Sequence, residues 1–198
     1  YLDGHDEDLD HASRAMSPRE QLLERLPIDM ANSVAPFLDR LGSSYWISFD
    51  MADFARHARF VAKVSDGTDS IVEAVHTRVN RPHDTTELWI MGPDRKGLFA
   101  DISRVIASCG ASVTHARLHT GPMGGDGKAQ VLNVFYLQNN DYKAFGSRNE
   151  QARKTLVKRA EAVMSGDARI PAIPTPLGSR RAKAIPVTPI ARFSDSAS

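Results

Sequence analysis

Residues 87–102 read Glu87-Leu88-Trp89-Ile90-Met91-Gly92-Pro93-Asp94-Arg95-Lys96-Gly97-Leu98-Phe99-Ala100-Asp101-Ile102 and decide the fold of this 198-residue chain. An apolar run, a polar turn and apolar residues at helical spacing predict a strand, a tight turn and the start of a helix. The N-terminus of a helix carries unpaired N–H groups and a partial positive charge. This turn is therefore a candidate site for a small anion or zwitterion.

The residues after this stretch predict further helices and strands. Leu98, Ile102, Val105, Ile106 and Cys109 recur at helical spacing, and the helix is expected to end at the glycine that follows them. The rest of the pattern predicts strands over residues 111–120 and 130–138, a loop over 121–128, a turn over 139–149, a helix over 153–164, a Pro-rich loop over 166–184 and a last strand over 185–193.

The resulting order of elements indicates an α+β fold of the ferredoxin-like βαββαβ type. In that topology the first and third strands are central, and here both are apolar on their two faces. His115, Arg117 and His119 make one face of the second strand polar, and Pro186 and Pro189 lie in the last strand; both features suit edge strands. Helices cover only one face of such a sheet. The other apolar face therefore predicts dimerisation or packing on a second copy of the module.

Helices are also expected ahead of this domain. Residues 17–20 contain a capping box with Pro at the first helical position, and a second apolar stripe runs over residues 28–41. An aromatic cluster at residues 45–50 precedes a third helix, and we interpret it as a clasp that packs a linker helix onto a neighbouring domain. Two alternating runs, residues 71–79 and 87–91, predict a hairpin.

Composition disfavours several classes of function. The formal net charge is +1, which provides no basic field for nucleic acid. Cys109 is the only cysteine, so an internal disulfide is excluded and a reducing, cytoplasmic compartment is expected. No apolar run approaches the roughly 18 residues of a membrane span. No paired carboxylates and no nucleophile–base arrangement are visible, so we expect no catalysis within this chain.

Parts of this pattern resemble a known module. The strand-turn-helix at residues 87–99 and the strand at residues 111–120 resemble the ACT domain, a small regulatory module that binds amino acids. Further stretches are similar to the first ACT region of the bifunctional uridylyltransferase/uridylyl-removing enzymes, which modify PII nitrogen-regulatory proteins: residues 45–50, Arg56-His57-Ala58, residues 132–138 and residues 189–198.

The resemblance implies a division of the chain. Residues 1–64 are expected to be the helical linker or tail of a preceding HD domain, residues 65–85 a connecting hairpin and residues 86–193 the ACT domain. Residues 194–198 would lead into a second ACT domain. The chain departs from the family pattern at three places: Lys96 stands where Pro is usual, Asn133 stands where Asp is usual, and the loop over residues 121–128 is longer.

The same resemblance implies a regulatory function. The parent enzyme would transfer UMP from UTP to the PII protein and remove it by hydrolysis, with Mg²⁺ expected in catalytic domains outside this chain. The region itself would carry no cofactor and would sense glutamine as an allosteric control. The implied partners are glutamine, the PII protein through the parent enzyme, and a second ACT module in a homodimer or in the same chain. Neither nucleic acid nor a membrane is implied.

The turn offers a specific chemistry for a free amino acid. The N–H groups of Gly97, Leu98 and Phe99 can bind the carboxylate, Asp94 can pair with the ammonium group, and Arg95 can steer the anion. Backbone polar groups of the facing strand complete the candidate set, in the ACT family often across a dimer interface: Ser112, Val113 and Thr114. In the alternative interpretation, Asp94 caps the helix and Gly97 makes the turn, with no ligand.

Other functions share parts of this pattern. An ACT module can belong to another amino-acid-responsive enzyme or to a free-standing regulator. An RNA-binding domain has the same βαββαβ order but needs stacking aromatic residues on one face of the third strand. Phe135 and Tyr136 are adjacent and point to opposite faces, which disfavours that function. His115 and His119 share a strand face without a neighbouring Cys, Asp or Glu, which disfavours a metal site.

Overall fold

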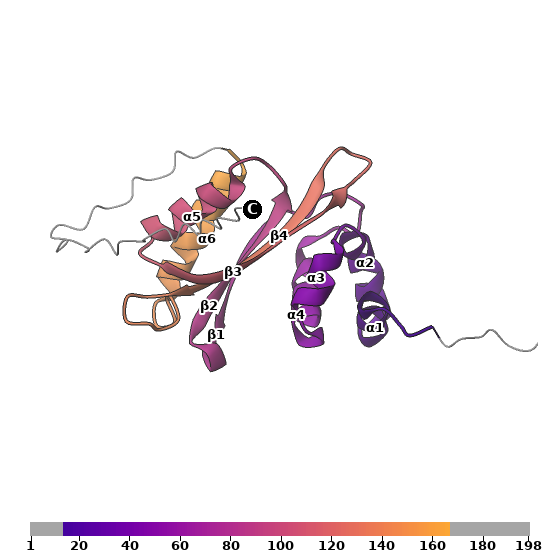
Figure 1. The fold of residues 1–198 in the computed structure, drawn as a ribbon, viewed down its shortest axis with the longest axis horizontal. Helices are drawn as coiled ribbons and strands as arrows, with labels where there is room; N and C mark the ends of the chain where they lie inside the picture. The colour runs from indigo at the N-terminus through magenta and orange to yellow at the C-terminus, as the bar shows by residue number, and fades with distance from the viewer. Residues whose placement is uncertain (1–13, 167–198) are drawn as a thin grey trace, which may run out of the picture.

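The computed structural model describes residues 14–166, which form three layers: one sheet with helices on both of its faces (Figure 1). One face of the sheet carries α5 (Leu98–Ser108) and α6 (Glu150–Met164). The opposite face carries the helical region: α1 (Pro18–Arg25), α2 (Ile28–Asp39), α3 (Ser43–Ser48) and α4 (Met51–Val64). Within the described residues, no helix is both long and apolar enough to cross a membrane.

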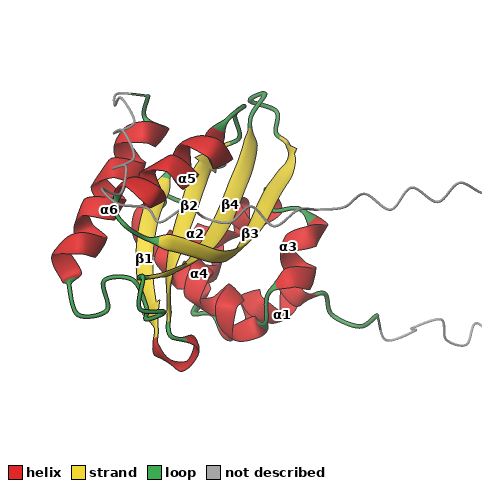
Figure 2. Ribbon diagram, turned by 60° about the vertical axis from the view of Figure 1, so that its left-hand side comes forward, coloured by secondary structure: helices red, strands yellow, loops and turns green. Residues whose placement is uncertain are grey.

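The sheet is four-stranded and antiparallel throughout, with the order β1-β2-β4-β3 (Figure 2). Its strands are β1 (Ala74–Asn80), β2 (Thr85–Pro93), β3 (Ser112–Met123) and β4 (Ala129–Gln138). The two central strands, β2 and β4, are buried along almost their whole length, as their two apolar faces predicted. The architecture is the expected α+β class, compatible with a ferredoxin-like domain joined to a helical region.

The layer formed by α5 and α6 packs through a largely apolar core. Four residues of the predicted stripe are buried in α5, whereas Cys109 is half-buried just after the helix; the stripe meets the face of β2 and β4 that also receives α6. The core residues of this contact are Leu88, Ile90, Leu98, Ile102, Val105, Ile106, Val131, Phe135, Leu137, Leu156, Ala160 and Val163. Burial of this area stabilises the layer, since apolar surface removed from water contributes roughly 25 cal/mol per Å².

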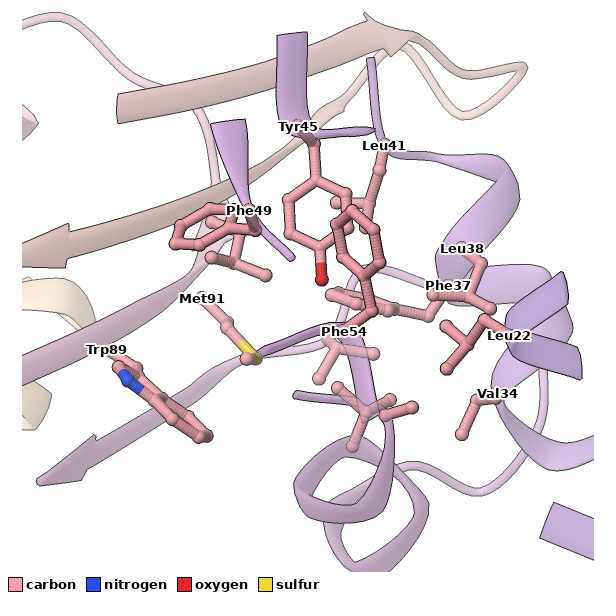
Figure 3. Packing of buried hydrophobic residues seen from close by; sticks show 14 of the residues in the cluster. Leu22, Val34, Phe37, Leu38, Leu41, Tyr45, Phe49, Phe54, Trp89 and Met91 are labelled. Atoms are coloured by element: carbon pink, nitrogen blue, oxygen red, sulfur yellow. The ribbon is translucent and has the colours of Figure 1, made fainter. Parts of the chain in front are cut away.

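The second apolar face of the sheet is covered by α1–α4 within the same chain. Trp89 and Met91 of β2 join a core that includes Tyr45, Phe49 and Phe54 of the helical region (Figure 3). Leu132, Val134 and Tyr136 of β4 complete that core. The open face that led us to expect a second copy is therefore already covered, and it gives no argument for dimerisation.

The edge of the sheet beside β2 is occupied by β1, which precedes β2 in the chain. A 3-10 turn, η1 (Arg81–His83), joins the two strands, and their pairing runs from Ala74 opposite Met91 to Asn80 opposite Thr85. The short connection makes β1 the nearest partner for this edge. The sequence had assigned the edge to residues 185–193, which, with the loop over 166–184 and the stretches 1–13 and 194–198, lie outside the described residues.

Three local features differ from the sequence-based expectation. The aromatic cluster at residues 45–50 is largely helical, as α3, and the interpretation of the cluster as a clasp is confirmed by its burial against the sheet. Strand β3 continues to Met123 after an irregularity and pairs there with Ala129, which shortens the loop expected at residues 121–128. Helix α6 begins at Glu150 rather than at residue 153, because the Asn149 side chain caps it.

Candidate functional site

The turn between β2 and α5 is held by its backbone. The N–H of Asp94 donates to the carbonyl of Ala129 (2.9 Å), and the N–H of Leu98 donates to the carbonyl of Arg95 (3.3 Å). Gly97 has a φ of 82° and is the N-cap residue of α5. Glycine adopts this left-handed conformation without the cost that a side chain would add. This φ agrees with the interpretation in which Gly97 makes the turn.

The first turn of α5 leaves donors free. The first helical hydrogen bond runs from the N–H of Asp101 to the carbonyl of Gly97 (3.0 Å). Among the described residues, none accepts a hydrogen bond from the N–H groups of Gly97, Phe99 or Ala100. The helix has no side-chain cap, so the alternative in which Asp94 caps α5 is wrong. These N–H groups remain available for an anion.

The Asp94 side chain is exposed, and no described residue forms an ion pair or hydrogen bond with its carboxylate. Arg95 behaves differently. Its Nη1 donates to Asp101 Oδ2 (2.8 Å) and its Nη2 to the carbonyl of Val163 (3.4 Å). Arg95 thus ties the turn to the first turn of α5 and to the end of α6. These contacts limit the freedom of its side chain for the predicted role, which was to steer an anion.

The apolar members of the turn have different environments. Leu98 is buried in the α5–α6 core, whereas Phe99 is 49% exposed and stacks on Phe135 with ring centroids 5.8 Å apart. Leu118 of β3, also 49% exposed, lies on the same face of the sheet as α5, because its neighbour His119 contacts the helical region. Phe99 and Leu118 thus leave apolar surface on the α5–β3 side of the domain.

The structure does not bring all the predicted site residues together within one chain. Ser112 pairs with Gln138 at one end of the sheet, whereas Pro93, which precedes the turn, pairs with Gln130 at the other end. Ser112, Val113 and Thr114 are exposed, and the Thr114 hydroxyl donates to the carbonyl of Tyr136 (3.1 Å). The two halves of the predicted site therefore lie at opposite ends of β3.

Two surface hollows lie away from the turn. One, of about 690 Å³, is lined by the β1–β2 connection, the segment after β4 and the start of α6; Asp84, Lys143 and Arg148 are among its residues. The other, of about 520 Å³, lies between β1 and α6. Neither includes residues 94–99, so the candidate turn is an open surface site rather than part of either hollow.

A buried glutamine beside the turn was missed by the sequence analysis. Gln130 has no exposed surface; its Oε1 accepts from the N–H of Val72 (2.8 Å), and its Nε2 donates to the carbonyl of Val72 (3.0 Å) and to that of Gly92 (3.4 Å). This side chain joins the segment before β1 to the end of β2. A polar residue near the start of a mostly apolar strand was the only sequence signal for it.

A buried arginine near the same end of the sheet was also missed. Arg40 follows α2 and forms ion pairs with Asp69 and Asp126. The contact with Arg40 is the largest cause of a lowered pKa of the Asp126 carboxyl. No sequence pattern identifies it, because its partners lie far along the chain.

Histidines of the helical region and β3 are bound to protein groups. His57 Nδ1 is 2.8 Å from the hydroxyl of Tyr45, and burial lowers the pKa of His57 to about 3. His119 Nδ1 is 3.1 Å from the hydroxyl of Ser44, and His115 stacks on Tyr136. Among the described residues, no three potential metal ligands gather at one place. The buried histidines therefore support the packing of α3 and α4 on the sheet.

Fold and site together define a ferredoxin-like α+β domain, packed on a helical region, with free helical N–H groups and an exposed carboxylate at one turn. No protein-family model and no solved structure matches the chain. Curated relatives do. The bifunctional uridylyltransferase/uridylyl-removing enzyme of Caulobacter vibrioides is 30% identical over 188 residues, or 94% of this chain and 18% of the relative.

Enzymes with the same name from other bacteria give similar matches. That of Phenylobacterium zucineum is 29% identical over 88% of this chain and 18% of its own length, and that of Gluconobacter oxydans is 32% identical over 68% and 13%. The chain thus corresponds to one region of the bifunctional uridylyltransferase/uridylyl-removing enzymes and spans 18% of the length of the first two relatives. The resemblance noted in the sequence is confirmed at this level.

Proposed function

We propose that this chain is a glutamine-sensing ACT region of a bifunctional enzyme that adds UMP to the PII protein and removes it. The observation that carries the proposal is the β2–α5 turn, where free N–H groups of α5 and the unpaired Asp94 carboxylate lie together in a relative of these enzymes. The catalytic domains, with the Mg²⁺ that UMP transfer from UTP would need, lie outside this chain. The proposed location is the cytoplasm.

The chemistry of the turn suits a zwitterion. The N–H groups of Phe99 and Ala100 would take the α-carboxylate, at the positive end of the α5 dipole. Asp94 would pair with the α-ammonium group, and such charge-assisted hydrogen bonds are about twice as strong as neutral ones. Arg95, held by Asp101, would fix the shape of the turn rather than contact the ligand directly.

The other half of the site would come from a second module. The outer edge of β3 pairs with no described strand. Two copies joined antiparallel at this edge would place the Ser112 end of one beside the Met123 end of the other. Met123 pairs with Ala129, whose carbonyl accepts from Asp94. Residues 112–114 of a second copy, or of a second ACT module in the same chain, would then lie beside the turn.

Thermal unfolding with glutamine tests the proposal. A ligand at 100 times its Kd raises the free energy of unfolding by about 2.7 kcal/mol, which raises Tm by about 5–10 °C for a chain of this size. Asp94→Asn and Gly97→Val are expected to abolish the shift. Asp141→Asn, at the opposite end of the sheet, serves as the matched control and should keep it.

The same measurement separates the alternatives. A shift with another amino acid, but not with glutamine, would assign the module to a different amino-acid-responsive protein. If no common amino acid at millimolar concentration raises the Tm of a chain that self-associates, glutamine sensing is overturned. The region would then serve only to pair with a second module.

A further inference from the structure

The β3–β4 loop and the candidate turn lie at the same end of the sheet. The loop spans residues 124–128, between Met123 and Ala129, which pair with each other. The carbonyl of Ala129 accepts the hydrogen bond of the Asp94 N–H at 2.9 Å. The loop and the first residue of the turn are thus one hydrogen bond apart.

A single arginine joins this loop to the helical region. The Arg40 side chain is 8% exposed, and its Nη2 lies 2.9 Å from Asp126 Oδ2. The same Nη2 donates to the carbonyl of Asp69 (2.6 Å), and Nε donates to Asp69 Oδ1 (3.0 Å). Arg40 therefore binds the loop through Nη1 and Nη2 and the segment before β1 through Nε and Nη2, so Nη2 takes part in both contacts. Its fork of donors makes this double contact rigid.

Backbone packing brings the same elements close together. A Cβ atom added at Gly121 of β3 would lie 1.7 Å from the carbonyl oxygen of Arg40, which is impossible without displacing the strand. A Cβ atom at Gly124 would lie 3.0 Å from Arg40 Nη1. The β3–β4 hairpin is thus pressed directly onto the chain at the end of α2, and the ion pair with Asp126 lies beside that contact.

We infer that Arg40 is a positioning residue for the candidate site: through Asp126 and the β3–β4 loop it fixes the β2–α5 turn relative to α2. This inference rests on the proposed function and adds the route by which ligand binding would reach the helical region. Binding coupling is reciprocal, so any displacement of α2 that weakens the Asp126 contact also weakens the ligand's hold on the turn.

The two partners of Arg40 provide a matched pair of variants. Asp126→Asn removes the charge from the loop contact but keeps an oxygen that can accept from the Lys128 N–H, which donates to Asp126 Oδ1 (3.0 Å). Asp69→Asn removes the other charge and leaves the loop contact in place. Both variants keep Arg40, so a general loss of a buried arginine cannot explain a difference between them.

The first measurement is amide hydrogen exchange of the unliganded chain at Asp94 and Leu98, whose N–H groups donate to the carbonyls of Ala129 and Arg95. Asp126→Asn is expected to speed exchange there about fivefold or more, since coupling energies of 1–3 kcal/mol correspond to factors of this size. Asp69→Asn should leave exchange within about twofold. Asp126→Glu, which keeps the charge, should restore part of the protection. Gly121→Ala should repeat the effect of Asp126→Asn through the backbone contact.

The second measurement is the Kd for glutamine, obtained from the dependence of Tm on glutamine concentration. Asp126→Asn should raise it about fivefold or more, and Asp69→Asn should not. Equal effects of the two variants, or none at the turn, would overturn the positioning role. A wild-type chain without any glutamine response would overturn the proposed function instead, while the exchange measurement would still decide whether Arg40 positions the turn.

Discussion

The two faces of the sheet are held in different ways. The contact with α5 and α6 is largely apolar, whereas the contact with α1–α4 adds part-buried polar links to β3, such as that between Ser44 and His119 and that between the Arg117 side chain and the carbonyl of Ser48. Apolar burial is non-directional, while hydrogen bonds and ion pairs require particular distances and angles. These directional contacts therefore fix the helical region in one position on the sheet.

The largest expected effect concerns the face of the sheet that carries α5 and α6. Phe135 has no exposed surface and lies at the centre of the α5–α6 contact, so Phe135→Ala should lower the free energy of unfolding by about 3–5 kcal/mol. Urea unfolding followed by circular dichroism measures this. Phe135→Leu, which keeps most of the volume, should cost much less. A loss below about 1 kcal/mol for the alanine variant would mean that this face is not a close-packed core.

The contact between the sheet and α1–α4 should respond to pH. Burial lowers the pKa of His57 from 6.5 to about 3. Between these two values the imidazole binds a proton in the unfolded chain but not in the folded chain. The free energy of unfolding therefore falls as the pH drops below 6.5. Between pH 7.5 and 5.5 this amounts to about 1.4 kcal/mol from His57 alone.

Urea unfolding at those two pH values checks the expectation. His57→Gln keeps an acceptor for the Tyr45 hydroxyl but does not titrate, so it should reduce the pH dependence. The pKa values of His76 and His119 are also lowered by burial and would account for the remaining slope. If stability depends on pH equally in the wild-type chain and in the His57→Gln variant, His57 is not the cause of that dependence.

A substitution in the turn between β2 and α5 should have a smaller effect on stability, caused only by backbone conformation. No atom lies within 4 Å of a Cβ added at Gly97, but φ there is 82°, so Gly97→Ala should cost about 1 kcal/mol. Gly125, also open but without positive φ, is the matched control and should change by less than about 0.5 kcal/mol. Equal stabilities of the two alanine variants would contradict the left-handed turn.

The smallest expected effect on stability comes from the exposed edge. Leu118→Ser replaces a side chain that is 49% exposed, so the free energy of unfolding should change by less than about 0.5 kcal/mol. Self-association, measured by analytical ultracentrifugation, should nevertheless weaken if β3 edges pair. A wild-type chain that stays monomeric at all concentrations would exclude this pairing between copies.

Local patterns predicted much of the fold. The capping box of Ser17 and Glu20 starts α1, the apolar stripe of α5 is buried, and the two-sided apolar strands are central. The hairpin of β1 and β2 was predicted as well, whereas the covering of the second face by α1–α4 and the presence of β1 at the edge assigned to residues 185–193 were not. They depend on contacts between residues far apart in the chain, and hydrophobic spacing does not say which apolar surfaces will meet.

The candidate site was predicted to a similar extent. The special backbone of Gly97 follows from its local sequence, and the free N–H groups follow from the helix start. Arg95 was expected to face a ligand, but Asp101, six residues later, pairs with it. Ser112 lies at the far end of the sheet, because α5 carries the chain back along the sheet before β3 begins, so β2 and β3 run parallel and their first residues lie at the same end.

The packing of the helical region on β4 has a consequence for the order in which the chain folds during synthesis. All four strands lie between residues 74 and 138, and α6, the last described element, ends at Met164. The helical region emerges first, with the sheet-facing sides of Tyr45 and Phe54 uncovered until Leu132 and Val134 of β4 have been made. The apolar surface of these helices is therefore exposed during translation until the residues of β4 have been made.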